Sequence, residues 1–182
     1  MRRILPALVF TSCLLVGLPV VSWAQTNPGF TFTWGGDGPS AKQQLKYVLD
    51  YGTPGHLNDR YRLKLGTQKV AISGITISYP DYYTGKFDAK SIELRVGVES
   101  KFFGGSRGKA LPTKIDVDQE NRLIQLTPEE VIPAGTSVEV ILSNVKNPSS
   151  GGMYYFNARI SSPGDVPLMR YIGTWILSIA RT

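Results

Sequence analysis

The stretch Asp59-Arg60-Tyr61-Arg62-Leu63-Lys64-Leu65 decides the fold, because its charged and apolar residues alternate along seven positions. Successive side chains of an extended strand point to opposite faces, so Tyr61, Leu63 and Leu65 share one face and the three cations share the other. One apolar face and one wet face are typical of a strand in an antiparallel sheet.

The same alternation recurs along the rest of the chain, and segments rich in Gly, Pro and Asn separate the runs. No long helical period interrupts them. The pattern predicts an all-β fold, a single antiparallel β-sandwich of the immunoglobulin-like type. The apolar positions of the runs are Ile92, Leu94, Val96 and Val98; Ile115 and Val117; Val138, Val140 and Leu142; Tyr154, Phe156, Ala158 and Ile160; and Trp175, Leu177 and Ile179.

The expected boundaries place the sandwich at residues 41–182, after a loose tail or first strand at residues 25–40. Residues 44–51 are ambiguous. Their alternate positions Leu45, Tyr47, Leu49 and Tyr51 fit a strand, whereas Leu45, Val48 and Leu49 fit a short helix. We favour the strand.

The N-terminal residues predict export. Arg2 and Arg3 precede an apolar run at residues 4–21, and Ser22-Trp23-Ala24 then offers small residues at a cleavage site. This order is that of a secretory signal peptide, residues 1–24, cleaved after Ala24. An uncleaved anchor is the alternative, but the run barely reaches the roughly 20 residues that span a bilayer and contains prolines. We expect the mature chain in the periplasm, the outer envelope or outside the cell.

Cleavage would remove Cys13, the only cysteine, so the mature chain would lack disulfides, thiolate nucleophiles and cysteine metal sites. It would also remove two of the 20 cations and lower the net charge from +6 to +4. This mild basic excess favours acidic glycans, lipopolysaccharide or an anionic membrane face as partners. Export makes nucleic acid a poor partner. A second apolar span is lacking, so we expect no transmembrane segment in the mature chain.

Five motifs carry a family resemblance. They are Tyr-Gly-Thr-Pro-Gly-His-Leu-Asn-Asp-Arg-Tyr-Arg-Leu at residues 51–63, Ile-Ser-Tyr-Pro at 77–80 followed by Gly-Lys-Phe at 85–87, Ile-Pro-Ala-Gly-Thr at 132–136, Ser-Asn-Val-Lys-Asn-Pro at 143–148, and Tyr-Ile-Gly-Thr-Trp at 171–175. Together they resemble a secreted cyanobacterial family known as domain of unknown function 2808. The resemblance implies an envelope or periplasmic protein and supplies no activity, cofactor or catalytic residue.

The aromatic residues Tyr79, Tyr82, Tyr83 and Phe87 are the best candidates for a binding surface. Because Tyr82 and Tyr83 are adjacent, an extended chain cannot point both rings into one core. Flat rings with polar neighbours suit a sugar or a protein partner. The alternative is that these rings cover the open end of the core.

Arg60 and Arg62 are the candidate charged residues of the same site. A structural alternative competes here too, in which Asp59 pairs with both arginines at the start of the strand.

A hydrolase is a weaker hypothesis. Residues 104–108, Gly-Gly-Ser-Arg-Gly, match the G-x-S-x-G pattern around Ser106, and His56 is the only histidine. The pattern requires a helix after the serine, which Pro112 blocks within a turn, so a glycine-rich hairpin loop is favoured.

Metal binding is a third hypothesis. Asp116, Asp118 and Glu120 alternate near a turn and offer oxygen ligands for calcium, although the EF-hand spacing fails. A solvated hairpin face explains them as well. A softer metal would require His56 to approach Met153 or Met169.

The sequence therefore predicts an exported, non-catalytic binding or structural protein of the cell envelope. Its expected partner is a glycan or another envelope protein. We expect no cofactor.

Overall fold

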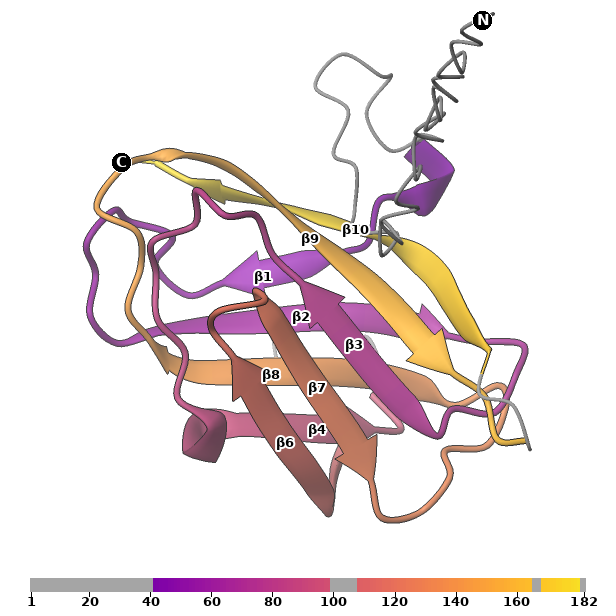
Figure 1. Ribbon diagram of the computed structural model, residues 1–182. Helices are drawn as coiled ribbons and strands as arrows, with labels where there is room; N and C mark the ends of the chain where they lie inside the picture. Colours follow the sequence, from indigo (N-terminus) through magenta and orange to yellow (C-terminus); the bar gives the residue numbers. More distant parts are fainter. Residues whose placement is uncertain (1–40, 99–107, 165–167, 181–182) are drawn as a thin grey trace, which may run out of the picture. The chain divides into compact units, whose positions relative to one another are not determined.

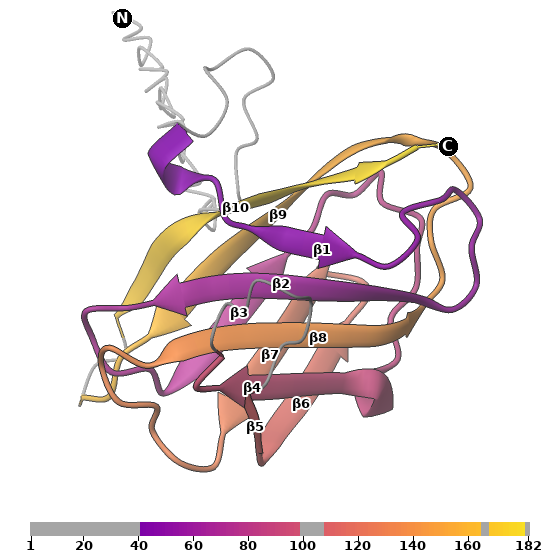
Figure 2. The ribbon, with the colours of Figure 1, turned by 180° about the vertical axis from the view of Figure 1, so that it is seen from behind.

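A computed structural model describes residues 41–98, 108–164 and 168–180, and these residues form two five-stranded antiparallel sheets. Sheet A has the strand order β1-β2-β8-β4-β5, and sheet B has the order β10-β9-β3-β7-β6. The strands of the two sheets cross where the sheets face each other (Figures 1 and 2). This confirms the predicted all-β sandwich. The predicted signal peptide and tail, residues 1–40, lie outside the described residues.

The elements have the following bounds: η1 Ala41–Gln43, β1 Tyr47–Leu49, β2 Asp59–Thr67, β3 Gly74–Ser78, η2 Ala89–Ser91, β4 Ile92–Val96, β5 Lys109–Leu111, β6 Thr113–Asp118, β7 Leu123–Pro128, β8 Ser137–Val145, β9 Gly152–Ser161 and β10 Met169–Ile179. The two helical elements of the described residues are single 3₁₀ turns. Neither could cross a membrane.

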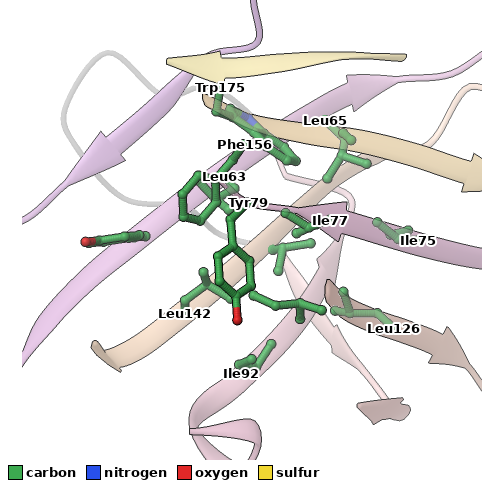
Figure 3. Packing of buried hydrophobic residues seen from close by; sticks show 14 of the residues in the cluster. Leu63, Leu65, Ile75, Ile77, Tyr79, Ile92, Leu126, Leu142, Phe156 and Trp175 are labelled. Carbon is green, nitrogen blue, oxygen red and sulfur yellow. The ribbon is translucent and has the colours of Figure 1, made fainter. Parts of the chain in front are cut away.

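The alternation in β2 has the predicted effect. Tyr61, Leu63 and Leu65 are buried between the sheets, whereas the cations point away from the core. The inward side chains of the other strands meet them, with Trp175 and Phe156 among the largest (Figure 3). The indole Nε1 of Trp175 donates to the carbonyl oxygen of Lys64 at 3.2 Å, so a polar contact also joins sheet B to sheet A.

The chain joins the two sheets along both sides of the sandwich. On one side β5 of sheet A continues through Pro112 into β6 of sheet B. On the other side the N–H of Leu45 donates to the carbonyl of Thr174 in β10 at 2.9 Å, and the chain then enters β1 of sheet A. The strand favoured at residues 44–51 is confirmed over Tyr47–Leu49, and a helical turn precedes it.

Candidate functional site

The aromatic segment lies in the loop between β3 and η2, and three of its four rings are buried. Tyr79, Tyr83 and Phe87 are 5%, 0% and 7% exposed, and the Tyr83 ring packs edge-on against Phe156 with centroids 5.1 Å apart. These rings close the end of the core and are unavailable to a ligand, which corrects the expectation of a four-ring binding surface.

Tyr82 is the exposed ring of the segment. The N–H of Tyr83 donates to the carbonyl of Pro80 at 3.0 Å, so the chain turns here and the neighbouring rings separate. Tyr82 is 44% exposed and stacks on Tyr154 with centroids 5.6 Å apart. Partial burial raises its pKa. One ring of the adjacent pair meets solvent, as predicted, but the prediction assumed an extended segment and the chain turns here.

A buried polar network lies beneath this loop. The Tyr61 hydroxyl donates to Oδ1 of Asn147 at 2.6 Å, and the Tyr83 hydroxyl lies 3.1 Å from that of Tyr61. The Nδ2 group of Asn147 donates to Oδ2 of Asp59 and to the carbonyl oxygen of Thr53, both at 2.8 Å. Burial raises the pKa values of Tyr61 and Tyr83, so both phenols stay neutral.

Asp59 completes the network and does not pair with the arginines beside it. Its carboxylate accepts the backbone N–H groups of Tyr51, Gly52 and Arg60 at 3.0, 2.8 and 2.7 Å. The proposed Asp59 pairing is wrong because Asp59 points into the molecule while its arginine neighbours point outward. The motifs at residues 51–63 and 143–148 thus meet in one network that closes this end of the sandwich.

Arg60 and Arg62 pair instead with Asp50, which follows β1. The Nη2 atom of Arg62 lies 2.9 Å from Oδ1 of Asp50, and Nη1 of Arg60 lies 3.9 Å from Oδ2. Arg60 keeps more than half of its side chain in solvent. The longer pair is a weak constraint, since exposed ion pairs contribute about 0–1 kcal/mol.

A shallow pocket of about 250 Å³ lies beside these arginines on the outer face of sheet A. Because β8 runs between β2 and β4, outward side chains of β2 and β4 flank the residues of β8. Ile141, which is nearly buried, and Ser143 come from β8. The complete lining is Arg60, Arg62, Glu93, Arg95, Ile141 and Ser143.

The lining of this pocket is rich in arginine, whose planar guanidinium suits carboxylate and phosphate oxygens. Arg60, Arg62 and Arg95 all line it, and the Nη2 atom of Arg95 pairs with Oε2 of Glu93 at 3.1 Å. A guanidinium carries five N–H donors, so the pairs that Arg60 and Arg62 make with Asp50 leave donors for a carboxylate, sulfate or phosphate. Tyr82 does not line the pocket, so the structure separates it from the two arginines.

Sequence reasoning missed Arg95, Glu93 and Ser143. Arg95 and Glu93 occupy polar positions of an alternating run, which predicts that they face outward. Their place beside Arg60 and Arg62 depends on the strand order β2-β8-β4, which alternation does not encode.

Among the acidic residues at the β6–β7 turn, Asp118 holds the turn itself. Oδ1 of Asp118 accepts the backbone N–H groups of Glu120 and Asn121, and Oδ2 accepts from the Asn121 side chain at 2.6 Å. These bonds from Asn121 lower the pKa of Asp118. No three His, Cys, Asp or Glu side chains gather as metal ligands anywhere in the described residues, so the structure does not bring Asp116, Asp118 and Glu120 together as a calcium site.

The remaining candidates do not assemble either. The His56 ring stacks on Tyr51 with centroids 4.0 Å apart. Met153 pairs with Ser178 and Met169 pairs with Ser161, so the two methionines occupy opposite ends of the β9–β10 ladder. Ser106 lies outside the described residues.

A family model described as "Protein of unknown function (DUF2808)" matches residues 30–179. The chain belongs to this family. The match confirms the family, domain of unknown function 2808, to which the five motifs point. A search of curated protein sequences found no match to this DUF2808 chain.

Solved structures with similar folds share little sequence with this DUF2808 chain. The collagen-binding domain of a Staphylococcus aureus adhesin is 12% identical, with a TM-score of 0.39 over 72% of this chain and 93% of that one. The collagen-binding subdomain of the Enterococcus faecalis surface protein ACE is 10% identical, with a TM-score of 0.41 over 72% and 95%. An uncharacterised Nocardia farcinica protein with an immunoglobulin-like fold is 9% identical, with a TM-score of 0.40 over 76% and 99%.

Proposed function

We propose that this protein is an exported, non-catalytic binding protein of the cell envelope, and that its pocket on sheet A holds an acidic glycan. The observation that carries the proposal is the presence of Arg60, Arg62 and Arg95 in the lining of one pocket. Export is supported by the signal-peptide pattern of residues 1–24.

A glycan suits the pocket better than a bare anion because a neutral hydroxyl lies among the charged groups. The Ser143 hydroxyl can donate to or accept from the hydroxyls of a sugar ring beside the arginines. The arginines would then bind carboxylate or sulfate groups of the same polymer in a bidentate manner.

Binding is favoured over hydrolysis by the state of the nearby carboxylates. Asp50 and Glu93 are both engaged in ion pairs with arginines, an arrangement that orients the guanidinium groups. A glycosidase instead directs two carboxyl groups at the scissile bond from opposite sides.

The test is calorimetric titration of the purified protein with polygalacturonate, which carries carboxylates, and with neutral dextran. We expect binding of the acidic polymer alone. Arg60→Gln and Arg95→Gln should each weaken it about tenfold, because a charge-assisted hydrogen bond contributes about 1.5–3 kcal/mol. Arg170→Gln, which makes the same charge change at the exposed start of β10, is the matched control and should change affinity by less than about twofold.

The proposal fails if both polymers bind equally, or if the control variant weakens binding as much as the pocket variants. Loss of binding in Tyr82→Ala with normal binding in Arg95→Gln would move the site to the loop after β3.

A further inference from the structure

Three of the four sheet edges in this fold are short or covered. The edge strands β1 and β5 of sheet A contain three residues each. The outer edge of β10 is covered by the chain itself, since the Ser178 N–H donates to the Tyr47 hydroxyl at 3.1 Å and the Ala180 N–H donates to the Gly52 carbonyl at 2.9 Å. Short or covered edges prevent strand addition by other chains.

The fourth edge, β6, is different. It has six residues and pairs along its length with β7 only (Figure 1). The Glu129 N–H donates to the Pro112 carbonyl at 3.0 Å, so these two residues form a hydrogen-bonded pair. Hydrogen-bonded and non-hydrogen-bonded pairs alternate along an antiparallel ladder, so Lys114 and Asp116 direct their backbone N–H and C=O groups to β7. Thr113, Ile115 and Val117 therefore direct theirs outward, and in the described part of the chain these groups make no backbone hydrogen bond.

We propose that β6 is an interface for a second copy of this chain, whose β6 pairs with it in antiparallel fashion about a two-fold axis through Ile115. In this register Ile115 faces the partner's Ile115 in a hydrogen-bonded pair, and Thr113 faces the partner's Val117. All three outward residues of each copy then exchange backbone hydrogen bonds. The two copies of sheet B become one continuous sheet.

The side chains of β6 are complementary to themselves in this register alone. Lys114 lies opposite the partner's Asp116 and Asp116 opposite the partner's Lys114, on the outer face and in non-hydrogen-bonded pairs, where side chains are closest. A shift of two residues in one direction places Asp116 opposite the partner's Asp116. The opposite shift places Lys114 opposite the partner's Lys114, and like charges repel in both registers.

The inner face of β6 also favours a second copy. Ile115 and Val117 point toward the core yet are only partly buried, unlike the inward residues of the neighbouring strand β7. A paired strand would cover them with the partner's identical side chains. The contact is isologous, because each copy uses the same surface, and such contacts close as dimers.

The first experiment is sedimentation equilibrium of the full chain over a concentration series. We expect a monomer–dimer equilibrium. Lys114→Asp and Asp116→Lys should each weaken dimerisation about tenfold, because two attractive pairs become repulsive. Mixing the two single variants should restore dimers, since every cross-strand pair is then again opposite in charge. A variant carrying both substitutions should dimerise like the wild type, and circular dichroism confirms that each variant folds.

The second experiment identifies the interface directly. A zero-length carbodiimide cross-linker applied to mixed ¹⁴N- and ¹⁵N-labelled protein should join Lys114 of one copy to Asp116 of the other, giving peptides of mixed label. Hydrogen exchange at Thr113, Ile115 and Val117 should slow as concentration rises. A monomer at every concentration overturns the proposal, whether these amides exchange freely or are protected by the chain's own residues 25–40. A dimer insensitive to the charge reversals overturns it as well.

Discussion

Both polar atoms of the Asn147 side chain are hydrogen-bonded, and these bonds hold together the segments that close one end of the sandwich. Its Oδ1 accepts from the Tyr61 hydroxyl, and its Nδ2 group donates to Asp59 and to the Thr53 carbonyl. Its backbone N–H donates to the carbonyl oxygen of His56. Buried polar groups are tolerated only when they are paired. The inward direction of Asp59 follows from the alternation of β2, in which it shares the face of Tyr61 and Leu63. Its partners could not be predicted, because they come from the segments before β2 and after β8.

Two conservative substitutions should show that the two tyrosines of this network contribute differently to the free energy of unfolding. Tyr61→Phe leaves Oδ1 of Asn147 buried without its donor, so we expect a loss of about 1–3 kcal/mol in the free energy of unfolding. Tyr83→Phe removes only the outermost hydroxyl and should cost about 1 kcal/mol or less. Urea unfolding measures both, and an equal cost for the two variants would contradict the hydrogen-bond order described.

The same tyrosines should make the fold sensitive to alkali. Burial raises their pKa values in the folded state, whereas unfolded tyrosine ionises near pH 10. Their contribution is therefore complete below about pH 10 and is lost as pH rises above it, because only the unfolded chain then releases the protons. Stability measured from about pH 8 to 11 should fall less steeply for the variant carrying both Tyr61→Phe and Tyr83→Phe.

The elements follow from alternation wherever a strand offers three or more inward apolar side chains. β2, β8, β9 and β10 meet this condition. No strand was predicted at β3 or β7, although Ile75 with Ile77 and Ile124 with Leu126 alternate just as Ile115 and Val117 of β6 do. The predicted run through Val98 ends instead at Val96, because Gly97 adopts a positive φ of 70° that leaves the strand.

The segment that leads from η1 to β1 crosses β10, and the close approach of the two leaves no room for a larger side chain at the crossing. Gly173 lies beneath the segment that leads from η1 to β1, and a Cβ atom there would collide with the carbonyl oxygen of Gln43 and with Leu45. Gly173→Ala should therefore lower the free energy of unfolding by about 1–3 kcal/mol, as overpacking does. Gly74→Ala in β3 is the control, because its nearest contacts are ordinary at 3.7 Å. Thermal unfolding of both variants measures the difference.

At the scale of the whole molecule, the binding surface depends on which strands are neighbours. The sequence predicted the outward direction of Arg60 and Arg62 and the basic bias. The pocket exists because β8 lies between β2 and β4, so that outward side chains of all three strands meet. Tyr82 was predicted beside the arginines and lies elsewhere, since the pocket contains no residue of its loop.

Salt should weaken glycan binding if the attraction between the arginines and the carboxylates of the polymer provides the affinity. Exposed charges are screened over about 10 Å at 0.1 M ionic strength and over about 3 Å at 1 M. We expect the affinity for polygalacturonate to fall steadily as sodium chloride is raised between these limits. An affinity that salt leaves unchanged would indicate apolar contacts in place of the arginines.

The most direct measurement is a map of backbone amide chemical shifts during titration of the labelled protein with polygalacturonate oligomers. The account predicts the largest changes at Arg60 and Arg62 of β2, Ile141 and Ser143 of β8, and Arg95 of β4, all on one face of sheet A. Changes confined to Tyr82 and its loop, or spread evenly over both sheets, would contradict it.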